Sequence, residues 1–204
     1  ARAEKRGNPL RVAVIRNGRG ILASRQEDHR QSIHHWRIAR DYFEEIGHDW
    51  GLAVTSHNIG MAYTGLEEYD EAEIYIERAY RQHEKLGHKR GMVGGLAMLG
   101  TIARKRGRHL PARRYYGRSL ALAADVGVTW SMLSTLVDLG ELALAEGDLA
   151  QAALLFAFAV DHDATEATTV SVDGVPPNQL ALDIGPKSVE RFAKAFLGAK
   201  TMFW

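Results

Sequence analysis

The sequence contains no cysteine, no long apolar run and no excess of charge of either sign. The absence of cysteine excludes a disulfide framework, thiolate metal sites and cysteine nucleophiles. The longest uninterrupted apolar segment, "AALLFAFAV", spans residues 152–160 and is far shorter than the roughly 20 residues of a membrane-spanning helix. No apolar segment follows the basic residues at the N-terminus, as it would in a secretory signal. We therefore expect a cytoplasmic protein that does not enter a membrane.

The charge balance limits which partners the chain as a whole can attract. It has 26 Lys and Arg against 25 Asp and Glu, a formal net charge of +1. This balance argues against a general affinity for nucleic acid or acidic membranes. The length of 204 residues allows one domain or two small ones, and a hydrophobic content of 46% is enough for a substantial core.

What the sequence does contain is a repeat of 40 residues, marked by two series of glycines. The first series is Gly7, Gly47, Gly87 and Gly127, and the second is Gly20, Gly60, Gly100 and Gly140. A small residue follows the second series by 12 positions and a large apolar residue follows it by 16. In the last three units these residues are Ala72, Ala112 and Ala152, and Ile76, Tyr116 and Phe156. Series that keep one interval through four units indicate an internal repeat.

Each unit has the pattern of two helices joined by a polar turn. In the second unit, the apolar spacings predict helices over about residues 50–64 and 70–86. The first glycine series stands where helices end on a left-handed residue. The second series falls inside helices, where glycine costs about 1 kcal/mol relative to alanine. It therefore predicts close approach of a partner helix, with Ala72 and its equivalents opposite the glycines.

This spacing resembles that of the tetratricopeptide repeat family. The segments that carry the resemblance are "NIGMAYTGLEEYDEAEIYIERA", "MLGTIARKRGRHLPARRYYGRS" and "DLGELALAEGDLAQAALLFAFA", and the pattern extends over about residues 7–166. The usual unit of that family has about 34 residues. The longer variety, with 40 residues as in this sequence, is familiar from bacterial regulators and from scaffold and motor-adaptor proteins. The resemblance implies an all-α fold, a right-handed solenoid of helix pairs with a C-terminal capping helix.

The expected organisation has three parts. Residues 1–166 hold four helix pairs, in units of about 7–46, 47–86, 87–126 and 127–166. Residues 167–185 form a linker, because prolines and glycines interrupt them. Residues 186–204 hold an amphipathic helix and a tail. This helix is expected either to cap the last apolar face of the solenoid or to occupy its groove.

In the resembled family, the first helix of each pair lines a concave groove that binds a peptide or a segment of a partner protein. The equivalent positions in this sequence are Val14, Asn17, Ile21, Ser24, Val54, His57, Asn58, Met61, Thr64, Gly94, Ala97, Thr101, Arg104, Lys105, Ser134, Val137, Glu141 and Leu144. Apolar and cationic groups together suggest an extended or helical peptide with apolar anchors and acidic character. The amide of Asn58 can bond a peptide backbone or a neighbouring repeat, because it both donates and accepts.

The segment "RKRGRHLPARRYYGR", residues 104–118, holds seven Lys or Arg. The equivalent segment one unit earlier is rich in Asp and Glu. We therefore expect charge pairing between neighbouring repeats, such as Glu73 with Arg113, each exposed pair being worth about 0–1 kcal/mol. Arg108, Arg113 and Arg114 also form a candidate basic rim for an acidic protein or for nucleic acid.

No constellation of catalytic or metal-binding residues stands out in the sequence. His83 and His88 are five residues apart, whereas a zinc-binding helix places its two histidines at i and i+4. There is no phosphate loop with its Lys-Ser/Thr pair and no serine in a nucleophile elbow. We therefore expect no enzymatic activity, no metal and no cofactor, and we interpret the chain as a protein-interaction module.

Three alternatives stay open at this point. The chain could be a sensor or regulatory domain of a larger signalling ATPase or transcription regulator. It could be a solenoid that binds nucleic acid through its basic segment, although the balanced charge disfavours this. It could also form a homodimer, because the C-terminal segment is apolar.

Overall fold

The computed structural model describes residues 8–148, 151, 152 and 155. This part of the chain contains seven α-helices and no strand. The helices are α1 (Pro9–Arg25), α2 (His29–Glu45), α3 (Asp49–Gly65), α4 (Tyr69–Lys85), α5 (Lys89–Lys105), α6 (His109–Val126) and α7 (Thr129–Ala145). Their first residues follow one another at intervals of 20, which is half of the sequence repeat. The predicted all-α fold is confirmed for the described residues.

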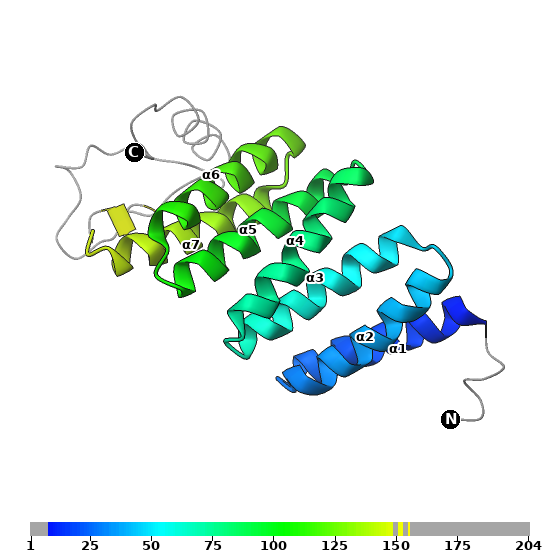
Figure 1. The fold of residues 1–204 in the computed structure, drawn as a ribbon. Coiled ribbons are helices and arrows are strands. Elements are labelled where there is room, and N and C mark those ends of the chain that lie inside the picture. Colours follow the sequence, from blue (N-terminus) through cyan, green and yellow to red (C-terminus); the bar gives the residue numbers. More distant parts are fainter. Residues whose placement is uncertain (1–7, 149–150, 153–154, 156–204) are drawn as a thin grey trace, which may run out of the picture. The chain divides into compact units, whose positions relative to one another are not determined.

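The contacts between residues divide the chain into two compact units, residues 1–106 and residues 107–204. In the first unit, each of the helices α1 to α4 packs against the next one along the chain, and α3 also touches α5. Figure 1 shows these helices as successive hairpins, coloured from blue to green. In the second unit, α6 packs against α7. Helices that pack on their neighbours in sequence are the arrangement of a helical repeat.

The C-terminal part of the expected organisation lies outside the described residues. This applies to the linker at 167–185, to the capping helix at 186–204 and to most of the last helix of the fourth pair. The division into four helix pairs with a cap therefore stays a prediction.

Left-handed residues end three helices where the glycine repeat predicts them. Gly47, Gly87 and Gly127 have φ angles of +65°, +63° and +73° after α2, α4 and α6, so this prediction is confirmed. A second left-handed position lies in the turns after α1 and α3. There the residues are Glu27 and Glu67, with φ angles of 59° and 60°, and glycine takes the equivalent position in the next two units.

The glycines inside the helices allow close packing, as predicted, but against a different neighbour. A Cβ atom on Gly20 would lie 2.4 Å from the indole of Trp36, and one on Gly60 would lie 2.6 Å from the side chain of Ile76. The expected neighbour of Gly60, Ala72, contributes only its carbonyl oxygen, at 3.2 Å. The large residue 16 positions after the glycine therefore fills the space, because its side chain reaches across to the preceding helix.

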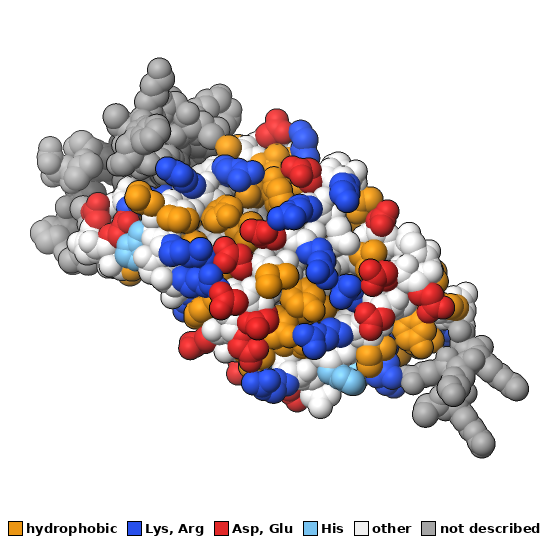
Figure 2. All heavy atoms as spheres, in the orientation of Figure 1, with side chains coloured by type: hydrophobic (Ala, Val, Ile, Leu, Met, Phe, Trp, Pro, Cys, Tyr) orange, Lys and Arg blue, Asp and Glu red, His pale blue; other side chains and the backbone are white. Residues whose placement is uncertain are grey.

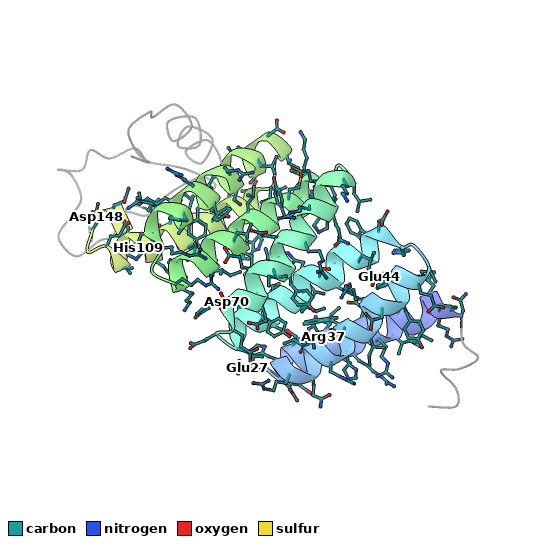
Figure 3. All side chains as sticks on the ribbon, viewed as in Figure 1. Glu27, Arg37, Glu44, Asp70, His109 and Asp148 are labelled. Carbon is teal, nitrogen blue, oxygen red and sulfur yellow. The ribbon has the colours of Figure 1, made fainter. Side chains whose placement is uncertain are left out.

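The core consists of small and branched side chains on one stripe of each helix. Ala53, Ile59, Ile76 and Ala79 of α3 and α4 are fully buried, and so is Tyr116 of α6. Burial of apolar surface stabilises the fold by about 25 cal/mol per Å². The outer surface is different in character, since Figure 2 shows Lys and Arg side chains interleaved with Asp, Glu and apolar ones. Figure 3 shows the same side chains on their helices.

Candidate functional site

The predicted groove residues of α3 and α5 lie on neighbouring helices of the first unit. Those of α3 are Val54, His57, Asn58, Met61 and Thr64, and those of α5 are Gly94, Ala97, Thr101, Arg104 and Lys105; we call these ten residues the α3–α5 surface. All of them are half-buried or exposed. The hydroxyl of Thr64 lies 3.9 Å from the sulfur of Met98 on α5, which links the two helices.

The remaining groove candidates lie on α1 and α7. On α1, Asn17 is half-buried and Ile21 is exposed, and both belong to the first unit. Val137 and Glu141 are exposed on α7, in the second unit. The structure therefore places the candidates of α3 and α5 on neighbouring helices. The candidates of α7 belong to the second compact unit.

An open cavity of about 240 Å³ lies at the α3–α5 surface, and we call it the Trp50 pocket. The residues that line it are Trp50, Val54, His57, Asn58, His83, His88, Arg90, Gly91 and Gly94. The groove prediction included four of these, on α3 and α5, but missed the rest. The missed residues lie in the first turns of α3 and α5, in the last turn of α4 and in the turn between α4 and α5. Only the packing of three helices brings them together.

Two histidines hold the junction between α4 and α5. His88 is the N-cap of α5, and its Nδ1 accepts a hydrogen bond from the backbone N–H of Gly91 at 3.1 Å. The Nδ1 of His83 lies 3.2 Å from the Nδ1 of His88. Because the His88 Nδ1 accepts the bond from Gly91, it carries no proton, so a hydrogen bond between the two rings requires the proton to be on the Nδ1 of His83. The bond from Gly91 thus fixes the tautomer of a neutral His88, with its proton on Nε2.

The indole of Trp50 forms one wall of the pocket. Its ring meets the ring of His88 edge-on, with the centroids 4.4 Å apart, and meets the ring of His83 at 5.8 Å. Trp50 nevertheless remains 46% exposed. Such an indole, packed on one side and open on the other, provides a large rigid contact area for a partner.

The interior of the pocket carries little charge at neutral pH. Burial, together with the neighbouring His88 and His57, lowers the pKa of His83 to about 4. Burial also lowers the pKa of His57. The Nδ1 of His57 is buried without a hydrogen-bond partner. His57, which lines the pocket, thus has one unpaired nitrogen on an uncharged ring.

Two glycines of α5 line the pocket for different reasons. A Cβ atom on Gly91 would lie 2.4 Å from the ring of His83, so the helices could not approach as they do with any other residue there. A Cβ atom on Gly94 would have only one neighbour within 4 Å, the Cε1 of His57 at 3.6 Å, which is an ordinary contact. Close packing therefore requires glycine at position 91 but not at position 94.

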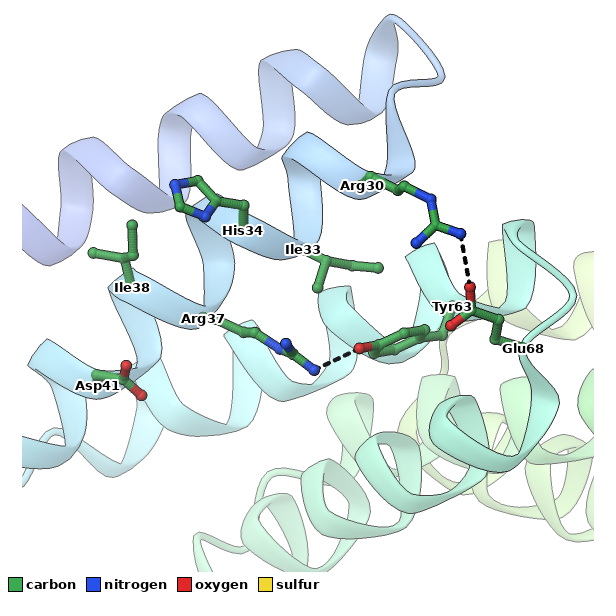
Figure 4. Close-up of a pocket in the computed structure, with 8 residues that line it drawn as sticks. All are labelled: Arg30, Ile33, His34, Arg37, Ile38, Asp41, Tyr63 and Glu68. Atoms are coloured by element: carbon green, nitrogen blue, oxygen red, sulfur yellow. Dashed lines mark hydrogen bonds and ion pairs between the residues drawn. The ribbon is translucent and has the colours of Figure 1, made fainter.

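A second cavity, of about 290 Å³, lies between α2 and the helices of the next pair (Figure 4). Arg37 donates a hydrogen bond to the hydroxyl of Tyr63 at 2.6 Å, and Arg30 pairs with Glu68 at 3.2 Å. The ring of Tyr63 stacks on that of Tyr75 with the centroids 5.7 Å apart. In Figure 3, Arg37 projects from α2 towards these helices. The interactions connect α2 to α3 and α4, so we assign this cavity a structural role.

Charge pairing between neighbouring repeats is confirmed, at Arg106. This residue pairs with Asp70 and, at 2.8 Å, with Glu73, both on α4. In the second unit, Arg113 pairs with Glu146. Glu73 belongs to the first compact unit and Arg113 to the second, so the expected pair of Glu73 with Arg113 stays a prediction. Because Arg113 already has a carboxylate partner, the candidate basic rim is less available to nucleic acid.

Two further properties concern the described residues alone. They contain no group of three or more His, Asp or Glu side chains placed to hold a metal ion. None of the helices they form is both long and apolar enough to cross a bilayer.

Short segments of the chain are similar to bacterial phosphoglycerate kinases. The kinase of Mycolicibacterium smegmatis is 51% identical over 47 residues, which is 23% of this chain and 11% of the kinase. The kinase of Solibacter usitatus is 39% identical over 75 residues, which is 34% of this chain and 19% of the kinase. The chain thus spans about a tenth to a fifth of the length of the curated relatives it matches. Such short matches do not establish kinase activity.

The comparison with solved structures and with protein families agrees with the fold. The crystal structure of BtubC (BKLC) from P. vanneervenii is similar to this chain with a TM-score of 0.66 and 17% sequence identity. The similarity covers 82% of this chain and 72% of that one. Residues 11–85 match the family model of the tetratricopeptide repeat. The resemblance to the tetratricopeptide repeat family, whose repeats mediate interactions between proteins, is thus supported over residues 11–85.

Proposed function

We propose that this chain is a protein-interaction module that binds a segment of a partner protein on the α3–α5 surface. The observation that carries the proposal is the Trp50 pocket, a cavity walled by an indole that is 46% exposed. Met61 is also 46% exposed and lies one turn beyond Asn58 on α3. Exposed aromatic and Met side chains around a concave site are characteristic of protein-binding surfaces.

The charges of the surface indicate the chemistry of the partner segment. Arg104 and Lys105 lie in the last turn of α5, and the α3–α5 surface contains no Asp or Glu. Cationic groups attract acidic residues and increase the association rate more than the affinity. The partner segment is therefore expected to combine apolar anchors with acidic residues, in an extended or helical conformation.

Peptides selected from a random library can stand in for the partner segment in a binding measurement. Random dodecapeptides displayed on phage would be selected on the immobilised protein, and the selected peptides would be synthesised with a fluorescent label. Their affinity would then be measured by fluorescence anisotropy for the wild type, Met61→Glu and Ile74→Glu. Ile74 is a matched control, because it is an exposed apolar residue of α4 outside the proposed surface.

We expect Met61→Glu to weaken peptide binding at least about tenfold, or 1.4 kcal/mol, because it places a carboxylate where an apolar anchor binds. Ile74→Glu should leave the affinity unchanged. Equal affinities for all three proteins would show that the peptides bind elsewhere, and the proposal would then be wrong.

The other functions suggested by the sequence stay predictions. A regulatory domain that binds a small effector should show a ligand-dependent rise in melting temperature. Nucleic-acid binding should show a steep dependence on salt concentration. A homodimer should show a molecular mass that depends on protein concentration.

A further inference from the structure

We propose that the Trp50 pocket holds one uncharged aromatic side chain of the partner segment, a tyrosine in particular. This inference rests on the proposed function, because it specifies the anchor that the α3–α5 surface recognises. It specifies one class of side chain at one position of the partner segment.

The size of the pocket suits a single side chain. Its volume of about 240 Å³ is below the roughly 300–1,000 Å³ that is typical of pockets for whole small molecules. The residue that keeps it open is Gly94. Val54 occupies the equivalent position one unit earlier, and Val14 occupies it two units earlier.

Gly94 has no packing role that would explain it. An added Cβ atom would make only an ordinary contact of 3.6 Å with His57. Glycine inside a helix costs about 1 kcal/mol relative to alanine, so this position carries a cost in stability that packing does not offset. Glycine at this position leaves the space above it open, which a larger side chain would fill.

The charges around the pocket exclude a cationic side chain. Among the described residues that line it, none is Asp or Glu, and Arg90 repels a cation. The pKa values of His57 and His83 are lowered, so these two rings supply no positive charge at neutral pH to pair with a buried carboxylate. Arg90 is exposed, so a carboxylate paired with it does not need to enter the pocket. An uncharged side chain therefore fits the interior of the pocket, because burying an unpaired charge is strongly unfavourable.

The walls of the pocket favour an aromatic ring that has one polar atom. The indole of Trp50 and the ring of His57 provide flat apolar surface, and the guanidinium of Arg90 can lie over the face of an inserted ring. The unpaired Nδ1 of His57 needs one hydrogen-bond partner. A tyrosine hydroxyl both donates and accepts, so it satisfies either tautomer of His57.

The test uses two substitutions at the same position. Gly94→Leu fills the pocket, whereas Gly94→Ala adds a single methyl group and leaves most of the space. Each variant would first be checked for helix content and melting temperature. Phage-displayed random dodecapeptides would be selected on the wild type, and the affinities of the synthetic peptides would be measured for the wild type, both Gly94 variants and Met61→Glu.

We expect the selected peptides to share one tyrosine, or another aromatic residue, at a constant position. Gly94→Leu should weaken their binding at least about tenfold, as the loss of one interface anchor does, and Gly94→Ala should weaken it little. Replacement of the shared tyrosine by leucine or glutamate in the peptide should have an effect as large as that of Gly94→Leu.

Other outcomes would separate this inference from the proposed function. Peptides that lose binding to Met61→Glu but not to Gly94→Leu would overturn the inference and leave the proposed function intact. Peptides that are sensitive to Gly94→Leu but share no aromatic residue would overturn the aromatic class. If no peptide depends on either residue, both the inference and the proposed function are wrong.

Discussion

The Nδ1 atoms of His83 and His88 lie 3.2 Å apart at the junction of α4 and α5. The same junction one unit earlier has a phenylalanine in place of the first histidine, since Phe43 and His48 lie with their ring centroids 5.1 Å apart. His48 caps α3 as His88 caps α5, by accepting a bond from the N–H of a glycine, Gly51, at 2.9 Å. The first residue of the α4–α5 junction, His83, can therefore be protonated, whereas the equivalent residue of the α2–α3 junction, Phe43, cannot.

This pair of junctions leads to a prediction about pH. The unfolded chain binds a proton on His83 near the ordinary pKa of 6.5, but the folded protein binds it only near a pKa of about 4. The contribution of neutral His83 to stability is therefore present above about pH 6.5 and is lost as the pH falls towards 4. The loss is on the order of 2–3 kcal/mol, because each pKa unit is worth about 1.4 kcal/mol.

His83→Phe isolates this effect, because Phe43 already occupies the equivalent position. Urea denaturation of both proteins at several pH values between about 7 and 4.5 measures the free energy of unfolding. Between about pH 7 and pH 4.5, we expect the free energy of unfolding of the wild type to fall by about 2–3 kcal/mol more than the free energy of unfolding of the variant. An equal fall in both proteins would mean that His83 is protonated as easily in the folded state as in the unfolded one.

The two pocket glycines should respond to alanine with opposite signs. Gly94→Ala should stabilise the protein by up to about 1 kcal/mol, because it raises helix propensity without a clash. Gly91→Ala should destabilise it by about 1–2 kcal/mol, because its Cβ would lie 2.4 Å from His83. Thermal or urea denaturation of the two variants against the wild type decides this. Stabilisation by both would show that α5 can move away from His83 at little cost.

Glu67 stands in a left-handed conformation that glycine adopts more easily. Its φ angle is 60°, and at the equivalent position one unit later Gly107 has a φ angle of 69°. We expect Glu67→Gly to raise the stability by about 0.5–1 kcal/mol, because the strain of a Cβ atom in this conformation is removed. Glu84→Gly is the matched control, since Glu84 is exposed in the last turn of α4.

The control variant should lose about 1 kcal/mol instead, because glycine disfavours a regular helix. Melting temperatures of both variants and the wild type provide the measurement. Destabilisation by Glu67→Gly as well as by Glu84→Gly would contradict the assigned backbone conformation. Glu27, labelled in Figure 3, occupies the same left-handed position in the equivalent turn one unit earlier, after α1.

The hydroxyl of Tyr63 connects the first two helix pairs through Arg37. Tyr63 is buried, and its hydroxyl accepts a hydrogen bond of 2.6 Å from the guanidinium. We expect Tyr63→Phe to lower the free energy of unfolding by about 1–2 kcal/mol, because a bond to a charged donor is lost. A double-mutant cycle with Arg37→Met measures the coupling. Additive effects of the two substitutions would show that the bond contributes nothing to stability.

The spacing of residues in the sequence determined the elements of the fold. Glycines at a constant interval predicted where α2, α4 and α6 end, and these predictions hold because a left-handed backbone is a local property of a residue and its neighbours. The apolar stripes predicted the helices and their buried faces for the same reason, since a helix places every third or fourth residue on one side.

Tertiary structure decided which side chains meet. Gly60 packs on Ile76 rather than on Ala72, and Arg106 reaches Glu73 from the turn after α5. Trp50 and His83 meet at the pocket although 33 positions separate them in the sequence. A repeat shows that helices stack, but the contacts between long side chains depend on the distance and angle of packing, and no local pattern in the sequence contains these.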